Sequence, residues 1–268
     1  MAGWEGVRTA DGSWTLAHPL HGQTCHSRAG AWQEARERYA AACRLRERAR
    51  PGATLRLLDV GTGLGLNLAA ALEALAGTGA RLEAWTLERD ASVFAAAAAL
   101  PPGPPEVERW HAPLRAALAR AEDGPLELVG LPAEAPEQRL ELRLGDARET
   151  LARTGDAPFD AVFLDAFSPG VEPELWSPEF LAALAARLAP EGLLSTYSVA
   201  LSVRRGLAAA GLGVGRGAAV GTKSAGTLAS RAAPLPPLDA RTARRLGRAR
   251  CQDRSSPVSS DGSARPEP

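Results

Sequence analysis

Residues 57–65 read Leu57-Leu58-Asp59-Val60-Gly61-Thr62-Gly63-Leu64-Gly65, an apolar run that ends in a Gly-x-Gly-x-Gly turn. An Ala- and Leu-rich stretch typical of a helix follows at once. Glycine permits the positive φ angles of a tight turn and lets the backbone approach a ligand closely, and the start of a helix offers free N–H groups. The stretch therefore predicts a strand, a turn and a helix that together hold a nucleotide-like ligand. A tight turn without a ligand is the alternative.

Two common nucleotide motifs are absent from this stretch. Leu66 occupies the position where the dinucleotide pattern Gly-x-Gly-x-x-Gly needs its third glycine. No Gly-Lys-Ser/Thr follows, so the turn is not the P-loop of a nucleoside-triphosphate enzyme.

Acidic residues end three later apolar runs, namely Trp85-Thr86-Leu87-Glu88, Leu142-Arg143-Leu144-Gly145-Asp146 and Phe163-Leu164-Asp165. Because the carboxyl ends of parallel strands meet at one edge of a sheet, we expect these side chains beside one ligand. Glu88 is expected to hold ribose hydroxyls. Asp146 is expected beside the base or as a helix N-cap. Asp165 is expected to accept or orient a proton of an attacking amine, or to cap the next helix.

The segments alternate between strand-like and helix-like patterns, which predicts an α/β fold with a doubly wound, mostly parallel sheet. We expect a hairpin within 5–28 and a long helix over 29–49, and a C-terminal antiparallel hairpin at 212–220 and 227–231. The strands in between are expected at 54–60, 81–88, 140–144, 159–164 and 191–198, and the helices at 66–76, 90–100, 147–153, 177–188 and 200–210. The Pro-rich stretch 101–139 is expected to be irregular. The predicted organisation is an extension (1–50), a main domain (51–232) and a disordered tail (233–268).

Composition excludes several classes of protein. The chain has 268 residues, with 31 basic and 31 acidic side chains, so it lacks the basic excess of a protein that coats DNA. It carries neither the long apolar run of a transmembrane helix nor a signal peptide. Three widely spaced cysteines make no disulfide framework. We therefore expect a cytoplasmic protein that does not bind membranes. We predict no oligomeric state.

A family resemblance rests on residues outside the Gly-rich turn. The run Phe163-Leu164-Asp165-Ala166-Phe167-Ser168-Pro169, followed by Glu174-Leu175-Trp176-Ser177, resembles the Phe-Leu-Asp-Gly-Phe-Ala-Pro…Met-Trp-Thr segment of MnmC-type tRNA methyltransferases. Val203-Arg204-Arg205-Gly206-Leu207 and Gly221-Thr222-Lys223 are similar to later parts of that family, and Ser27 and Gln33-Glu34 to an earlier one. The chain departs from the pattern at Ala166, where the family has glycine, and at Cys25 and His26, which replace a more aromatic pair.

The resemblance implies a class I methyltransferase fold and S-adenosylmethionine (SAM) as the methyl donor. It implies N-methylation of 5-aminomethyl-2-thiouridine at the tRNA wobble position, without the FAD-dependent half of the fused family members. Asp165 is the catalytic candidate. The residues expected at the cofactor are Asp59, Gly61, Gly63, Gly65, Asn67, Glu88, Asp146 and Ala147, and those expected at the substrate are Phe167, Trp176, Arg204, Arg205 and Lys223.

Several alternatives stay open. Trp176 stacks on a nucleobase or packs against the following helix, and Arg204 and Arg205 meet phosphates or form a solvated face. The cluster His18, His21, Cys25 and His26 lacks the spacing of a zinc site, so we expect no metal and interpret it as a loop over the cofactor. The basic run at Arg241–Arg250 attracts RNA or is simply solvated. The rival functions are an aminopropyl transferase and a catalytically silent SAM- or RNA-binding module.

Overall fold

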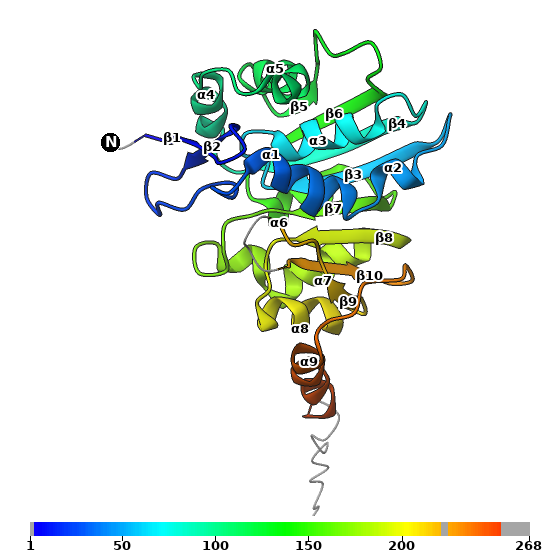
Figure 1. Ribbon diagram of the computed structural model, residues 1–268. Helices are drawn as coiled ribbons and strands as arrows, with labels where there is room; N and C mark the ends of the chain where they lie inside the picture. Colours follow the sequence, from blue (N-terminus) through cyan, green and yellow to red (C-terminus); the bar gives the residue numbers. More distant parts are fainter. Residues whose placement is uncertain (1–2, 221–224, 253–268) are drawn as a thin grey trace, which may run out of the picture.

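The computed structural model describes residues 3–220 and 225–252 (Figure 1). Its main sheet has eight strands in the order β5-β6-β4-β3-β7-β8-β10-β9, and β1 and β2 pair as a separate antiparallel hairpin. The strands are β1 Glu5–Arg8, β2 Trp14–Ala17, β3 Thr54–Val60, β4 Arg81–Glu88, β5 Gly124–Leu126, β6 Glu137–Leu144, β7 Phe159–Leu164, β8 Leu188–Thr196, β9 Gly213–Arg216 and β10 Thr227–Ser230.

The helical elements alternate with these strands. They are α1 Ala31–Glu34, the π-helical η1 Ala35–Ala41, α2 Leu45–Arg48, α3 Leu66–Leu75, α4 Ser92–Ala98, α5 Pro105–Leu118, α6 Ala147–Thr150, the 3-10 turns η2 Leu151–Thr154 and η3 Pro173–Trp176, α7 Pro178–Arg187, α8 Leu201–Ala209 and α9 Ala240–Gln252. Within the described residues, no helix is long and apolar enough to cross a bilayer.

The five central strands, β6, β4, β3, β7 and β8, run parallel, while β5, β10 and β9 add antiparallel edges. The predicted α/β, mostly parallel sheet with a C-terminal antiparallel hairpin is therefore confirmed. From β3 the chain winds outward through β4 to β6, then crosses back to β7 on the other side of β3. Such a reversal opens a crevice at the carboxyl ends of the strands, where ligands of this architecture bind.

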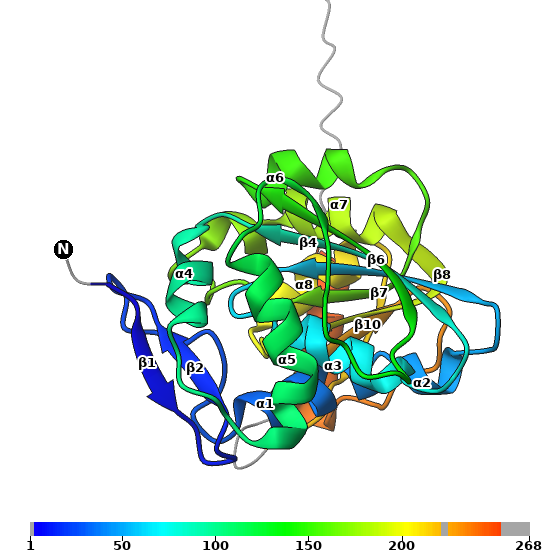
Figure 2. The same ribbon diagram turned by 90° about the horizontal axis from the view of Figure 1, so that it is seen from above.

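Both faces of the sheet are covered, which explains why β3 is an almost unbroken apolar run. Leu57 packs in a core with η1, α3 and α5, and its neighbour Leu58 packs in a second core with α7 and α8. Figure 1 shows the sheet running from β5 and β6 at the top down to β9, with α9 beyond it. Figure 2 shows the β1–β2 hairpin standing beside α4 at one side of the molecule.

The structure corrects three expectations about the elements. The helix expected over 29–49 is broken: η1 is π-helical, and Arg44, with φ 55°, separates it from α2. The stretch 101–139 is not wholly irregular, because Pro105 opens the fourteen-residue helix α5 and proline is well tolerated in the first turn of a helix. Residues 240–252 of the expected disordered tail form α9.

Candidate active site

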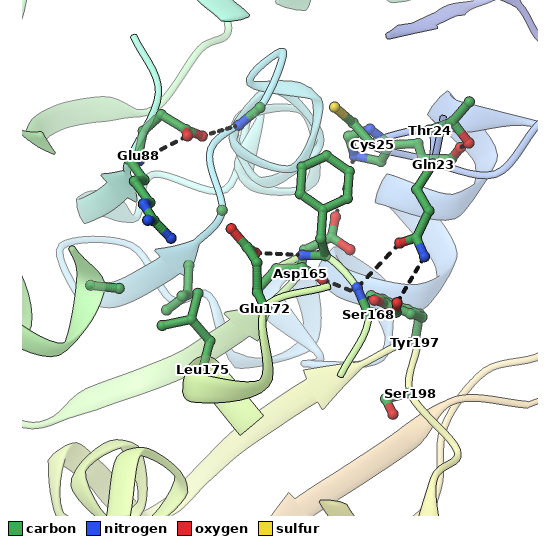
Figure 3. A pocket seen from close by; sticks show the side chains of 18 of the residues that line it. Gln23, Thr24, Cys25, Glu88, Asp165, Ser168, Glu172, Leu175, Tyr197 and Ser198 are labelled. Carbon is green, nitrogen blue, oxygen red and sulfur yellow. Dashed lines mark hydrogen bonds and ion pairs between the residues drawn. The ribbon is translucent and has the colours of Figure 1, made fainter. Parts of the chain in front are cut away.

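A cavity of about 750 Å³ lies at the carboxyl ends of β3, β4, β6 and β7, which is in the size range of small-molecule sites. The loop that follows β2 forms a further wall of this cavity, with Gln23, Thr24, Cys25 and His26. Gln23 Nε2 donates to the hydroxyl of Ser168 across the cavity, 2.8 Å away (Figure 3). Residues from the first fifty positions are therefore part of the site.

The Gly-rich turn shapes one wall of the cavity. Gly61 has φ 89°, and a Cβ at this position would lie 2.9 Å from the carbonyl oxygen of Asp165. Gly63 has φ 51° and also lines the cavity. Gly65 has a different role, because a Cβ there would lie 2.8 Å from a methyl group of Leu118. It allows α3 and α5 to approach closely and is not among the residues that line the cavity, so its contact with the cofactor stays a prediction.

Glu88 ends β4 and faces the cavity next to this turn. One carboxylate oxygen accepts the backbone N–H of Gly63 at 2.9 Å, and the other accepts those of Arg89 and Asp90 at 2.8 and 2.9 Å (Figure 3). Burial raises the pKa of Glu88. A carboxylate fixed by three backbone donors retains lone pairs that can accept hydroxyl protons, as ribose recognition requires.

Asp146 and Ala147 follow β6 and line the same cavity. The Asp146 side chain caps α6, with Oδ1 accepting the backbone N–H of Arg148 at 2.9 Å. The hydrogen bond from the Arg148 guanidinium holds the pKa of Asp146 down at about 2. The cap and a place beside the ligand therefore occur together at Asp146.

Asp165 directly follows β7 and lines the cavity. Its side chain is 4% exposed. Oδ1 accepts the hydroxyl of Tyr39 at 2.5 Å, and Oδ2 accepts Asn67 Nδ2 at 2.8 Å. Burial raises the pKa of Asp165 to about 6. The carboxylate is thus oriented on both oxygens and faces a cavity that a substrate amine can enter.

Asp59 and Asn67 lie behind the cavity and do not line it. Asp59 is fully buried and accepts the Thr86 hydroxyl at 2.8 Å, and burial raises its pKa well above the ordinary value. Asn67 orients Asp165. Both residues were expected to contact the cofactor. In the structure they support the residues that face it.

Four further residues complete the site and were not in the expected set: His26, Glu34, Arg38 and Tyr39. The first three line the cavity, and Arg38 Nε lies 3.0 Å from Glu34 Oε1 in a buried ion pair. Glu34 belongs to the Gln33-Glu34 resemblance, which was a usable signal. Tyr39 had no such signal in the sequence, because its spacing from the other apolar residues of 29–49 indicated only the buried face of a helix.

The expected substrate residues divide into different groups. Phe167 lines the cavity. Trp176 is 6% exposed, donates from Nε1 to the Phe167 carbonyl at 2.7 Å and packs edge-on against Tyr197, so it supports the loop instead of stacking on a base.

The two arginines expected at the substrate lie away from the cavity wall. Arg204 is also 6% exposed and donates to Thr227 Oγ1 at 2.9 Å, so its guanidinium does not reach phosphates. Arg205 is exposed and donates to the Arg245 carbonyl, away from the cavity. Lys223 lies outside the described residues.

A cluster of aromatic rings forms at the mouth of the cavity, and we call it the aromatic rim. It consists of Trp4, His18, His21 and Phe167. His18 lies edge-on to Trp4 and Phe167, with ring centroids 4.8 and 5.3 Å away, and stacks on His21 at 4.3 Å. Trp4 Nε1 donates to Ser92 Oγ at 3.0 Å, which fixes its ring. Across the described ranges, no group of three or more His, Cys, Asp or Glu side chains has the geometry of a metal site.

The fold, the Gly-rich turn and the acidic strand ends together define a class I SAM-dependent methyltransferase. The site fits SAM, because Gly61 and Gly63 line the cavity with bare backbone and Glu88 presents a fixed carboxylate beside them. Residues 108–232 match the model of the S-adenosyl-L-methionine-dependent methyltransferase family Methyltransf_30.

The relatives are more specific than this class. The crystal structure of MnmC2 from Aquifex aeolicus is 36% identical to the chain, with a TM-score of 0.78, covering 92% of this chain and 76% of that one. The "tRNA 5-methylaminomethyl-2-thiouridine biosynthesis bifunctional protein MnmC" of Pseudomonas paraeruginosa is 36% identical over 76% of this chain and 32% of its own length. The protein of the same name in Aromatoleum aromaticum is 37% identical over 76% and 31%.

The chain belongs to the MnmC family of SAM-dependent methyltransferases. It spans about a third of the length of the bifunctional relatives.

Proposed function

We propose that this chain N-methylates the aminomethyl group of 5-aminomethyl-2-thiouridine at the wobble position of tRNA, in the cytoplasm. The names of the bifunctional relatives support the substrate. The observation that carries the chemistry is the buried Asp165 carboxylate, oriented by Tyr39 and Asn67 and open to the cavity beside Gly61.

The residues act on the proton of the substrate. A primary amine is an ammonium ion near neutral pH and is not nucleophilic until it loses a proton. The ionised Asp165 accepts that proton, and the N–H bonding pair stays on nitrogen as the attacking lone pair. SAM, when bound, supplies a sulfonium methyl group to this lone pair. Tyr39 and Asn67 hold the carboxylate in one orientation, so little reorganisation accompanies the transfer.

The aromatic rim supports a substrate that carries a nucleobase. Aromatic side chains stack on unpaired bases, the usual way in which proteins recognise single-stranded RNA. Trp4 and Phe167 both line the cavity that holds Asp165. A base stacked at the rim would therefore lie at the mouth of the cavity that holds Asp165.

An aminopropyl transferase would need further free carboxylates for the far ammonium of a diamine. Glu172 and Glu174 line the cavity, and each has one partner: Glu172 accepts the backbone N–H of Phe167 at 2.9 Å, and Glu174 pairs with Arg89 at 3.3 Å. The names of the bifunctional relatives favour the methyltransferase over this rival.

Nucleoside mass spectrometry tests the proposal. The chain is incubated with SAM and with tRNA from cells that lack methylaminomethyl formation. We expect a gain of one methyl group on 5-aminomethyl-2-thiouridine. Asp165→Asn should abolish the gain, and Asp156→Asn, the same change at an exposed position, should not.

The possible failures differ from one another. Aminopropyl transfer to a diamine from decarboxylated SAM would support the rival enzyme. Thermal stabilisation by SAM without turnover on any amine would support a silent binding module.

A further inference from the structure

His26 is a buried imidazole directly beside the candidate base. The residue is 4% exposed and lines the cavity, and its Nε2 lies 3.5 Å from Asp165 Oδ2. Its backbone N–H donates to Thr15 Oγ1 at 2.9 Å, and its carbonyl accepts the Thr24 hydroxyl at 2.7 Å. The strand β2 and the loop after it therefore fix the ring at this position.

Neither nitrogen of this ring has a hydrogen-bond partner among the described residues. Buried polar atoms are almost always paired, because an unpaired one loses its contacts with water without replacement. An unpartnered imidazole on a cavity wall therefore points to a partner that arrives with the substrate. Catalytic hydrogen bonds are often long before substrate binds and shorten in the complex.

The titratable and charged groups that share the cavity wall with His26 come from several elements. Asp165 follows β7, Glu34 and Arg38 form an ion pair in the helical segment after the loop, and Cys25 precedes His26. His111, on α5, donates from Nε2 to the Leu64 carbonyl at 2.8 Å, and burial lowers its pKa to about 4. His111 is therefore neutral at pH 7. Burial raises the pKa of Cys25, which stays a thiol. Asp165 is the carboxylate that His26 reaches, with Oδ2 3.5 Å from Nε2.

We propose that His26 is the second proton acceptor of this active site, which takes at Nε2 the proton that Asp165 removes from the substrate ammonium. The inference rests on the proposed function. The proton moves from the ammonium to Asp165 Oδ2 and then to the lone pair of His26 Nε2. Asp165 becomes a carboxylate again, paired with the imidazolium, and the imidazolium, which lines the cavity, releases its proton to the solvent there.

This second acceptor solves a problem that the burial of Asp165 creates. While Asp165 holds the proton of the substrate it cannot act as a base again, and its side chain is 4% exposed, so the proton must pass to another group that lines the cavity. The imidazole provides an acceptor nitrogen, Nε2, 3.5 Å from Oδ2 of Asp165. It prepares Asp165 for the next turnover without exposing it.

Steady-state methyl transfer over many turnovers, measured between pH 6 and pH 9, tests the proposal. His26→Asn retains polar atoms but accepts no proton. We expect its rate at pH 7 to fall about 10- to 100-fold, with the KM for tRNA within about twofold of wild type. The defect should shrink toward pH 9, where the free amine no longer needs a base. Added imidazole should partly restore His26→Ala.

The control variant is His111→Asn, a second buried histidine near the same loop. It should lower thermal stability without changing the shape of the pH profile, because His111 faces no proton-transfer partner. A His26→Asn defect of equal size at all pH values, without imidazole rescue of His26→Ala, would overturn the proposal and leave only a structural role. An unchanged rate would overturn it as well. A wild-type chain without methyl transfer would overturn the proposed function and this inference together, so the two failures are distinguishable.

Discussion

The buried carboxylate of Asp165, which we propose as the catalytic base, lowers the stability of the folded chain when it is ionised. Its pKa rises from an ordinary 3.8 to about 6 on folding, because burial disfavours the charged form. The folded chain therefore binds this proton more tightly than the unfolded chain. The cost of the buried charge is present above about pH 6 and is lost as the pH falls below 4.

Asp165→Asn should remove both the activity and this cost. We expect the methyl-transfer rate to fall about 10²- to 10⁴-fold. The free energy of unfolding should rise by roughly 1–3 kcal/mol at pH 8 and hardly change at pH 4. Urea unfolding at the two pH values measures this. A variant that is less stable at pH 8 than wild type would contradict the assigned electrostatics.

Gly61→Ala should be far more harmful than an alanine at another glycine of positive φ. The new Cβ would lie 2.9 Å from the Asp165 carbonyl oxygen and 3.1 Å from the Ala166 nitrogen, and both are backbone atoms. We expect a loss of about 2–4 kcal/mol, the sum of the left-handed strain and the clash. Gly77→Ala, with φ 69° and nothing within 4 Å, should cost only about 1 kcal/mol. Equal losses of unfolding free energy for the two variants in urea would show that backbone strain alone, without the clash at Asp165, determines the cost.

The sequence predicted the residues whose position on a strand determines their environment. Gly61, Gly63, Glu88, Asp146 and Asp165 follow strand ends, and parallel strands bring their ends together. Asp59 shows the limit of this logic. It is acidic and lies only two residues before Gly61. Side chains alternate between the two faces of a strand, however, and the side chain of Asp59 is fully buried. His26 and Tyr39 reach the site through tertiary packing of a distant segment, which no local pattern encodes.

At the scale of elements, periodicity located the central strands to the residue at β3, β4 and β7. It failed where packing overrides local preference. The helix over 29–49 breaks because η1 places Arg38 and Tyr39, both at most 1% exposed, toward the core and the site. Prolines around 101–105 suggested a loop, whereas the last of them opens α5. Helix α9 contains no long apolar stripe, so its composition resembled that of a disordered tail.

Arg204 belongs to this scale, because it joins α8 to β10. Arg204→Gln should lower the free energy of unfolding by about 1–3 kcal/mol, since it leaves Thr227 Oγ1 and nearby buried groups without their donor. The KM for tRNA should stay within about twofold. The neighbouring, exposed Arg205→Gln should change stability by less than about 0.5 kcal/mol. A loss of RNA affinity in Arg204→Gln without a stability loss would restore the phosphate interpretation.

At the scale of the molecule, the aromatic rim joins the N-terminal hairpin region to the loop after β7. Trp4→Ala should raise the KM for tRNA about tenfold, in line with the loss of one base stack. The affinity for SAM should change by less than about twofold, and Trp4→Phe should recover most of the tRNA binding. Steady-state kinetics and calorimetry separate the two effects. Loss of SAM affinity instead would indicate that the ring covers the methyl donor.

The strand order also has a consequence for co-translational folding. Val60 ends the central strand β3, but its partner β7 begins only at Phe159, so residues 61–158 are synthesised before that edge can pair. During this interval the nascent half-sheet exposes the apolar edge of β3, a surface that chaperones recognise. Asp165 is synthesised after His26, Tyr39 and Asn67, so the contacts of these three side chains with its carboxylate form only once β7 has joined the sheet.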